Sequence, residues 1–325
     1  MRVGLDVSPL DQTAAGTARY LAALEGLDGI EVVKLVRHGS DRIATVYRDA
    51  VWYPFILPRE AGKARLEVLH CPTFRGPLRP PPCPLVVTVH DLAVLRHPET
   101  FNVWTRHYSR LCVSRVAQAA RLVIAVSEHT KRDIVQLLGA REDRIRVVPN
   151  GVGPVFTPDG PRESGDYVLA VGTLEPRKNL PRLAEATRRL GVELRVAGAP
   201  GWGRVELGSG VRRLGRPSDE ELARLYRGAR CLAYPSLYEG FGIPILEAMA
   251  SGTPVVTSRG GATEEVAGGA AVLVDPRDPA AIAAGIEEAS ARRGELVASG
   301  LERARAFSWA ETARRTADVY REAAA

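Results

Sequence analysis

Two carboxylates, Glu239 and Glu247, frame the most informative stretch of this sequence, Glu-Gly-Phe-Gly-Ile-Pro-Ile-Leu-Glu. The proline in it suits the first turn of a helix, where its missing N–H costs no hydrogen bond, so the stretch predicts a loop that runs into a helix. The backbone N–H groups of Phe241, Gly242 and Ile243 would lie free at the positive end of that helix, which attracts phosphate. Because carboxylates accept hydrogen bonds from hydroxyls, the stretch fits a ligand with sugar hydroxyls at two ends and phosphate between them, a nucleotide sugar.

Two adjacent cations, Arg177 and Lys178, lie in a second stretch, between the apolar run Tyr167–Val171 and a predicted helix. At the C-terminal end of a parallel strand such a pair is well placed to hold a diphosphate. Charged residues are also common at strand–helix junctions, so the cation pair alone is weak evidence for a binding site. Its combination with the two carboxylates makes the evidence stronger. Both stretches are expected at the same edge of one sheet, and together they predict an anion-binding site there.

The first half of the chain offers a histidine and a glycine. His90 ends the apolar run Leu85–His90, and a residue in that place should point into the ligand site. Gly16, followed by Thr17, lies in the short turn Asp11–Tyr20 ahead of a helix, and a glycine there would let the backbone approach a phosphate. Each signal is weak alone, because an isolated histidine is usually structural and a single glycine before a helix is often only a turn.

Several signatures of other chemistries are missing from the sequence. No Asp-x-Asp occurs, so nothing resembles a metal-carboxylate clamp. The absence of a Gly-x-Gly-x-x-Gly after the first strand and of a P-loop argues against dinucleotide binding and ATPase chemistry, and there is no Gly-x-Ser-x-Gly elbow. We therefore expect neither a metal ion nor another cofactor.

Cysteine usage and hydropathy indicate a cytoplasmic protein. The four cysteines show no metal-type spacing and are expected to be free thiols, although Cys71 and Cys83 could form a bridge. No apolar run approaches the roughly 20 residues of a membrane helix. Met1–Val7 predicts a strand rather than a signal peptide, because Asp6 interrupts its apolar run.

The excess positive charge lies in the first half of the chain. Residues 1–158 carry 21 Lys and Arg against 15 Asp and Glu, whereas residues 159–325 carry 23 of each, which leaves a formal net charge of +6. A basic face attracts anionic lipid headgroups or nucleic acid. The sequence holds no nucleic-acid motif, and its few aromatics do not interleave with the basic residues. An arginine-rich surface without a partner is the alternative.

Short apolar runs alternate with longer helical patterns along the whole chain. Such runs imply parallel sheets covered on both faces, and two series of them imply two doubly wound α/β domains with the ligand in the cleft between them. The expected strands are Arg2–Val7, Glu31–Val36, Val68–His70, Leu85–His90, Leu122–Val126 and Arg146–Val148, then Tyr167–Val171, Glu193–Ala197, Arg212–Leu214, Cys231–Tyr234, Pro254–Thr257 and Ala271–Val274.

The segment Phe156–Gly165, rich in proline, glycine and charge, is the best linker in the chain. We therefore expect a first domain at residues 1–158 and a second at residues 159–306. Residues 307–325 predict a single helix with Ser308 as its cap and no strand after it. This helix should pack on the first domain, with packing on its own domain as the alternative.

In their order and spacing these motifs resemble family 4 of the retaining glycosyltransferases, enzymes with the GT-B fold of two facing Rossmann-like domains. The resemblance spans about residues 1 to 275, and the block from Glu239 to Glu247 is its most specific part. The matching stretches are Gly16–Tyr20, Thr88–Leu92, Ala125–Glu128, Val148–Val152, Val171–Leu180 and Tyr234–Val256.

The resemblance implies a role for each residue of the acidic block. Glu239 would bind hydroxyls of the donor sugar. The backbone at Phe241, Gly242 and Ile243 would hold the sugar and the diphosphate. Glu247 would bind the ribose hydroxyls, so neither carboxylate needs to act as an acid or a base.

The resemblance also assigns the cations. Arg177 and Lys178 would neutralise the diphosphate, and Arg216 would contact the base through its backbone. Many family members have an arginine directly after the glycine of the phosphate strand, where this chain has Thr173. Thr173 would still lie against the donor, and Arg177 would supply the missing charge.

In the first domain the resemblance implies that His90 faces the donor sugar near the reacting carbon. Gly16 would pack under the phosphates and the acceptor, next to Thr17. Ala14-Ala15-Gly16 replaces the run of glycines that is usual at this turn, so the acceptor side matches the family less well than the donor side.

The implied activity is metal-independent transfer of a hexose from a nucleoside diphosphate sugar to an acceptor hydroxyl, with anomeric retention. His90–Leu92 followed by Arg96–Glu99 resembles the mannosyltransferases of the family, which makes GDP-mannose the first choice of donor and leaves UDP-glucose and UDP-N-acetylglucosamine open. A glycan or lipid-linked acceptor, as in polysaccharide biosynthesis, would be reached by peripheral membrane contact of the basic first domain. A nucleotide-sugar epimerase and a non-catalytic nucleotide-sugar-binding protein are the alternatives.

Overall fold

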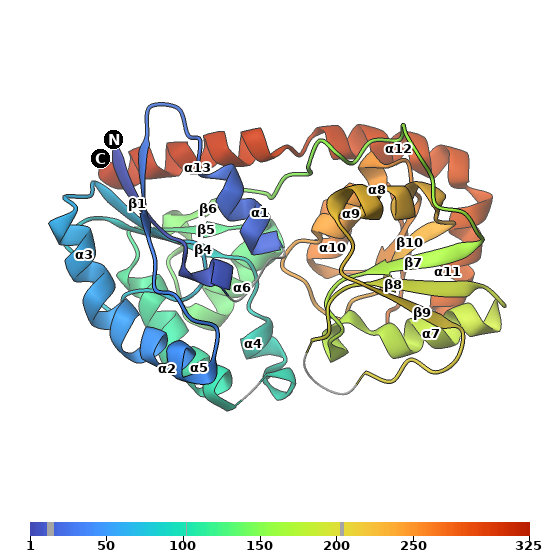
Figure 1. Cartoon of the computed structure of the whole chain (residues 1–325), viewed down its shortest axis with the longest axis horizontal. Helices are drawn as coiled ribbons and strands as arrows, with labels where there is room; N and C mark the ends of the chain where they lie inside the picture. Colours follow the sequence, from blue (N-terminus) through green and yellow to red (C-terminus); the bar gives the residue numbers. More distant parts are fainter. Residues whose placement is uncertain (12–15, 102, 202–204) are drawn as a thin grey trace. The chain divides into compact units, whose positions relative to one another are not determined.

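The computed structural model describes residues 1–11, 16–101, 103–201 and 205–325, which form two compact α/β units (Figure 1). The first unit comprises Met1–Asn150 together with Trp309–Ala325, and the second unit comprises Gly151–Ser308. Each unit is built around a six-stranded sheet.

The sheet of the first unit has the order β2-β1-β3-β4-β5-β6, and every neighbouring pair of strands is parallel. Its strands are β1 (Arg2–Asp6), β2 (Glu31–Leu35), β3 (Val68–Cys71), β4 (Leu85–Val89), β5 (Leu122–Ala125) and β6 (Ile145–Val147). Its helices and helical turns are η1 (Ser8–Asp11), α1 (Gly16–Ala23), α2 (Arg42–Tyr47), the π-helical η2 (Arg48–Ile56), α3 (Leu57–Lys63), α4 (Ala93–Arg96), η3 (Pro98–Thr100), α5 (Val103–Ala119), α6 (Glu128–Leu138), η4 (Glu142–Arg144) and α13 (Trp309–Ala324).

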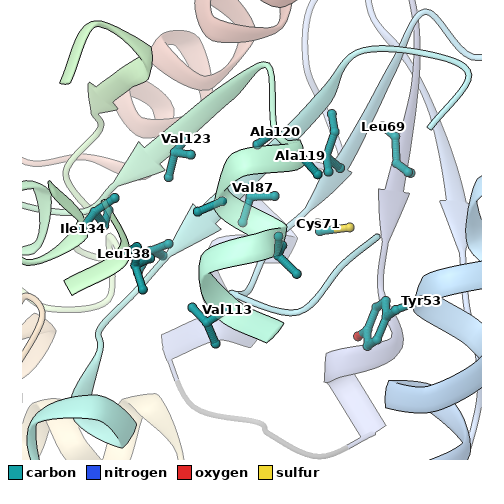
Figure 2. Close-up of a cluster of buried hydrophobic side chains, with 14 of the residues drawn as sticks. Tyr53, Leu69, Cys71, Val87, Val113, Ala119, Ala120, Val123, Ile134 and Leu138 are labelled. Carbon is teal, nitrogen blue, oxygen red and sulfur yellow. The ribbon is translucent and has the colours of Figure 1, made fainter. Parts of the chain in front are cut away.

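The core of the first unit lies between this sheet and the helices α5 and α6. Figure 2 shows Val113 of α5 and Ile134 of α6 next to Val87 of β4 and Val123 of β5, and all four side chains are at most 1% exposed. Central strands that are covered on both faces need apolar residues at every position, which is why these strands read as continuous apolar runs.

The sheet of the second unit has the order β12-β11-β10-β7-β8-β9, again with parallel neighbours. Its strands are β7 (Tyr167–Val171), β8 (Glu193–Ala197), β9 (Val211–Gly215), β10 (Cys231–Tyr234), β11 (Val255–Ser258) and β12 (Val272–Val274). Its helices and helical turns are η5 (Pro176–Lys178), α7 (Leu180–Arg189), α8 (Asp219–Gly228), α9 (Ile243–Ala250), α10 (Gly261–Ala267), α11 (Pro279–Ala291) and α12 (Arg293–Arg305).

The strand pattern predicted from the sequence is confirmed. All twelve expected strands are present, each within one residue of its expected ends; the first six form one parallel sheet and the last six form the other. The four cysteines are unpaired, so the bridge between Cys71 and Cys83 is not formed. Within the described residues, no helix combines the length and the apolar character needed to cross a membrane.

The proline-rich segment expected to be a linker is part of the second unit, which begins at Gly151 rather than at residue 159. Phe156 is buried, and its ring meets the ring of Tyr226 edge-on with centroids 5.9 Å apart. Arg227 of α8 donates to the carbonyls of Pro161 at 2.7 Å and Thr157 at 3.2 Å. These contacts hold the segment on α8, and a composition typical of linkers does not reveal them.

The last helix, α13, packs on the first unit, as expected. Its Tyr320 hydroxyl lies 2.6 Å from Nδ1 of His70, whose Nε2 lies 2.8 Å from the hydroxyl of Thr88. Thr312 donates to the carbonyl of Pro149 at 2.8 Å. A buried polar chain therefore connects the last helix to β3 and β4.

Candidate functional site

The stretch between the two carboxylates forms a loop that leads into α9, with proline at the second helical position. Gly242, the residue before the helix, has a φ of +118°, a backbone conformation that favours glycine. The N–H groups of Phe241, Gly242 and Ile243 donate to no acceptor among the described residues. Three backbone donors at the positive end of α9 are therefore available to an anion.

Glu239, at the start of this loop, is 9% exposed and binds two cations. One carboxylate oxygen accepts from Arg177 Nη1 at 2.6 Å and the other from Lys178 Nζ at 2.6 Å. Burial alone would raise its pKa, but the charges of Arg177 and Lys178 outweigh burial and lower the pKa to about 2. Glu239 is therefore ionised at neutral pH, and without ligand its carboxylate binds two cations. Its expected contact with the hydroxyls of the donor sugar stays a prediction.

Arg177 lies on η5, directly after β7, and is held from three sides. Besides Glu239, its guanidinium donates to the carbonyl of Tyr238 at 2.7 Å and to Oε1 of Glu175 at 2.6 Å. Glu175 is itself only 2% exposed. Because a guanidinium presents its donors in a rigid planar fork, these acceptors fix the orientation of Arg177.

Lys178 is held by a phenol as well as by Glu239. Its Nζ donates to the hydroxyl of Tyr234 at 2.7 Å and lies 4.9 Å from the centre of that ring. A Cβ on Gly172 would come within 3.0 Å of Lys178 Cε, so the glycine leaves room for the lysine stem. Burial lowers the pKa of Lys178, and the charge of Glu239 opposes that shift.

Glu247 lies about one turn into α9 and is 1% exposed. Its Oε2 accepts a hydrogen bond of 2.9 Å from the hydroxyl of Tyr226 on α8. The structure thus places this carboxylate inside the second unit, covered by protein atoms. Its assignment to ribose stays a prediction.

The remaining donor candidates of the second unit lie at the ends of other strands. Thr173 is half-buried and follows Gly172 at the end of β7. Arg216 is exposed and follows β9, whose last residue Gly215 has a φ of +66°. Because β9, β8, β7 and β10 are parallel neighbours in the sheet, these residues share its C-terminal edge with Arg177 and Lys178.

His90 follows β4 in the first unit, and its ring meets the ring of Tyr20 edge-on with centroids 5.0 Å apart. The carbonyl of Pro72 accepts a hydrogen bond from the ring, and the buried Nε2 has no partner among the described residues. Burial lowers the pKa to about 4 against the opposing effects of Asp91 and Pro72. His90 is therefore neutral at pH 7, with Nε2 as a hydrogen-bond acceptor.

Gly16 and Thr17 form the start of α1, and both are half-buried. Tyr20, one turn further along α1, is the residue that contacts His90, so the start of this helix lies near the end of β4. Residues 12–15 of the preceding turn, including Ala14-Ala15, lie outside the described residues.

Within the second unit the structure brings Arg177, Lys178 and Glu239 into direct contact. His90, Gly16 and Thr17 belong to the first unit. Two further residues that hold these cations were not expected from the sequence: Glu175, which accepts from Arg177, and Tyr234, which accepts from Lys178. In the sequence, Glu175 is an acid two residues before a cation pair, and Tyr234 is a tyrosine at the end of a buried strand. Both patterns are too common to identify a site residue.

Two family profiles match the chain. "Glycosyltransferase Family 4" covers residues 13–156, and "Glycosyl transferases group 1" covers residues 165–292. The O-antigen chain mannosyltransferase B of Escherichia coli is 33% identical over 302 residues, which is 83% of this chain and 79% of the relative. A D-inositol 3-phosphate glycosyltransferase of Nocardioides is 32% identical over 292 residues, or 74% of this chain and 63% of the relative.

Solved structures share the fold over nearly the whole chain. Sucrose-phosphate synthase from Thermosynechococcus elongatus has a TM-score of 0.78 at 20% identity and covers 99% of this chain and 98% of its own. HepE from Anabaena in complex with UDP-glucose has a TM-score of 0.73 at 17% identity, with 99% and 100% covered. With its two parallel six-stranded sheets, the chain has the GT-B fold and belongs to glycosyltransferase family 4.

Proposed function

We propose that this glycosyltransferase moves mannose from GDP-mannose to a hydroxyl of a glycan or lipid-linked acceptor, with anomeric retention. The observation that carries the proposal is the position of Arg177 and Lys178, buried and bound to Glu239, in the unit that also holds the unengaged amides at the start of α9. The choice of mannose rests on the similarity to the E. coli mannosyltransferase and on the sequence at His90–Glu99. The O-antigen named for that relative supports a role in polysaccharide biosynthesis.

The chemistry of the leaving group supports this use of the cations. As the bond between the anomeric carbon and the phosphate oxygen breaks, negative charge develops on the diphosphate. Arg177, Lys178 and the N-terminus of α9 would stabilise that charge, and groups of this kind typically contribute about 10²–10³ in rate each. These positive groups are the reason to propose that the reaction needs no metal ion.

The two remaining candidates would bind the sugar. Once a diphosphate binds Arg177 and Lys178, the carboxylate of Glu239, which these two cations hold without ligand, becomes free to accept hydrogen bonds from sugar hydroxyls. The neutral ring of His90 would accept a hydrogen bond at Nε2 from another sugar hydroxyl. The acceptor hydroxyl would attack from the face that the diphosphate leaves, and its proton would pass to a phosphate oxygen.

A cytoplasmic location with peripheral contact to the membrane is part of the proposal. The net positive charge of residues 1–158 supports it, because anionic lipid headgroups attract basic surfaces. Such contact would bring the protein to a lipid-linked acceptor.

The donor is tested by thermal unfolding with GDP-mannose, UDP-glucose and UDP-N-acetylglucosamine at one common concentration, set at 100-fold excess over the dissociation constant of GDP-mannose. The bound donor should add about 2–3 kcal/mol to the free energy of unfolding. Arg177→Gln should reduce this gain, and Arg188→Gln on α7, an exposed arginine, is the matched control. A larger gain with a UDP-sugar would overturn the choice of GDP-mannose.

The reaction is tested by incubating the protein with GDP-mannose and a glycan or lipid-linked acceptor in the presence of EDTA. Proton NMR of the product should show an α-mannosidic bond, the configuration of the donor. A β-linked product would exclude retention, and loss of turnover in EDTA would exclude metal independence. Epimerised donor, or binding without turnover, would favour the two alternative functions.

A further inference from the structure

Exposed large apolar side chains gather on two neighbouring helical stretches of the first unit. Among the described residues, every large apolar side chain that is exposed belongs to this unit. Most of these side chains lie on α2, η2 and α5. We name six of them the apolar patch: Ile43, Tyr47, Phe55, Val103, Trp104 and Leu111.

The two stretches form one surface, because a buried acid connects them. The indole N–H of Trp104 on α5 donates to Oδ2 of Asp49 on η2 at 2.9 Å. Asp49 is 2% exposed, and its Oδ1 lies 3.1 Å from Nε of Arg75. The hydrogen bond from the indole brings Trp104 of α5 against η2.

Helical spacing places the apolar side chains on the outer faces. Ile43 and Tyr47 are four residues apart on α2, and Trp104 and Leu111 are seven apart on α5, so each pair shares one face of its helix. Ile43 is 83% exposed and Leu111 64% exposed. Exposed apolar side chains scattered singly need no explanation, but a contiguous patch marks a binding surface.

Exposed cations outnumber acids around the apolar patch. Residues 42–59 and 103–118 carry six arginines, of which all but the buried Arg48 are exposed. The same stretches contain one acid, the buried Asp49, and the first stretch is flanked by two more, Asp41 at the N-cap of α2 and Glu60 in α3. The exposed arginines are Arg42, Arg59, Arg106, Arg110 and Arg115. An apolar, aromatic surface surrounded by cations is the composition of interfacial membrane-binding segments.

We propose that the apolar patch and its surrounding arginines dock this protein on an anionic lipid surface. The inference rests on the proposed peripheral contact and identifies the residues that make it. Apolar side chains would enter the headgroup region, and the exposed arginines would be attracted to the anionic headgroups. A second copy of the chain is the poorer occupant, because symmetric pairing would bring like charges together.

The test uses the full chain and sedimentation with vesicles. We expect binding to vesicles of equimolar phosphatidylcholine and phosphatidylglycerol, little binding to phosphatidylcholine alone, and weaker binding as salt rises from about 0.1 M to about 1 M, because the Debye length falls from about 10 Å to about 3 Å. Arg106→Glu with Arg110→Glu, and separately Ile43→Ser with Leu111→Ser, should each weaken binding about tenfold or more.

A matched charge reversal in the second unit, Arg188→Glu with Arg212→Glu, is the control, since both arginines are exposed. It should leave vesicle binding unchanged. The proposal is overturned if the wild type does not bind the anionic vesicles, if the control weakens binding as much as the patch variants, or if the patch variants bind normally. Dissociation of a wild-type dimer by the patch variants, measured by analytical ultracentrifugation, would assign the surface to self-association instead.

The test is independent of the reaction. Substitutions at exposed positions change stability little, and a circular dichroism melt checks that each variant folds. The patch variants should still be stabilised by the nucleotide donor as the wild type is. Donor binding without vesicle binding would overturn the docking proposal alone, and vesicle binding without donor binding would overturn the donor proposal alone.

Discussion

At the scale of single residues, the charged cluster of Glu175, Arg177, Lys178 and Glu239 is balanced and buried, with each side chain at most 11% exposed. Buried ion pairs contribute little net stability, because desolvation of the charges offsets their attraction. We infer that the cluster is kept for binding. Glu239 holds the cations in place without ligand, and a diphosphate would compete with it for both.

Replacing Lys178 by glutamine should lower kcat by about 10²–10³ and raise the KM for the donor by less, because the ammonium acts mainly on charge that develops in the transition state. Glutamine keeps a donor for Tyr234 and for Glu239, so the fold should persist. Steady-state kinetics of the variant, next to Arg188→Gln as the exposed control, measure this. A raised KM with unchanged kcat would show that Lys178 binds the ground state and the transition state equally.

At the scale of elements, α9 depends on the residue before it. An alanine at Gly242 would adopt a φ of +118° against its preference, and its Cβ would lie 3.1 Å from Ile245 Cδ1. We expect Gly242→Ala to cost about 1–3 kcal/mol of stability and to weaken nucleotide binding by moving the amides of Gly242 and Ile243.

Gly294→Ala is the control for that substitution. Gly294 lies on α12, and an added Cβ there meets no atom within 4 Å. It should stabilise the protein by roughly 0.5–1 kcal/mol, because glycine is the poorer helix former. Urea unfolding and calorimetric titration with GDP-mannose measure both variants. Equal stability of both variants would mean that the backbone at Gly242 relaxes without strain.

Elements were predictable from the sequence where one local pattern determines them. The apolar runs located all the strands because buried parallel strands have no polar face, and the proline located the start of α9. The π-helical stretch Arg48–Ile56 was not expected, since it contains Pro54 and no local pattern specifies it. Composition also misplaced the start of the second unit, which depends on the packing of Phe156 against Tyr226.

The site was predictable as a set of positions but not as a set of contacts. The sequence placed Arg177 and Glu239 at one sheet edge, yet not in contact with each other, because 61 intervening residues and the strand order bring them together. The 1% exposure of Glu247 follows from α8 covering α9, with Tyr226 as its partner. Contacts between residues so far apart in the sequence cannot be predicted from a local pattern.

At the scale of the whole molecule, two buried histidines make the first unit sensitive to acid. Burial, and to a lesser degree the nearby His90, lowers the pKa of His70 to about 3, and burial lowers the pKa of His90 to about 4. Unfolding would return each to an ordinary value near 6.5. The unfolded chain therefore binds protons that the folded chain does not, so stability falls as pH drops below about 6.5 and keeps falling until the folded pKa values are reached.

Glu239 acts in a different pH window. Its folded pKa of about 2 lies below its usual value of 4.5, so the stability that it contributes is present above pH 4.5 and is lost only as pH falls from there toward 2. Any loss of stability between pH 7 and pH 5 therefore reports on histidines rather than on this carboxylate.

His70→Gln tests the assignment of that loss. Between pH 7 and pH 5 the wild type should lose about 2 kcal/mol more unfolding free energy than the variant, since one buried group whose pKa lies near 3 when folded and near 6.5 when unfolded contributes that amount. Urea unfolding followed by circular dichroism at both pH values measures the difference, and exposed histidines cancel in it. Even if the variant is less stable at pH 7, through lost contacts with Tyr320 and Thr88, its pH dependence remains informative. An equal loss in both proteins would mean that His70 takes up its proton without unfolding, and that the buried chain joining α13 to the sheet opens in the native state.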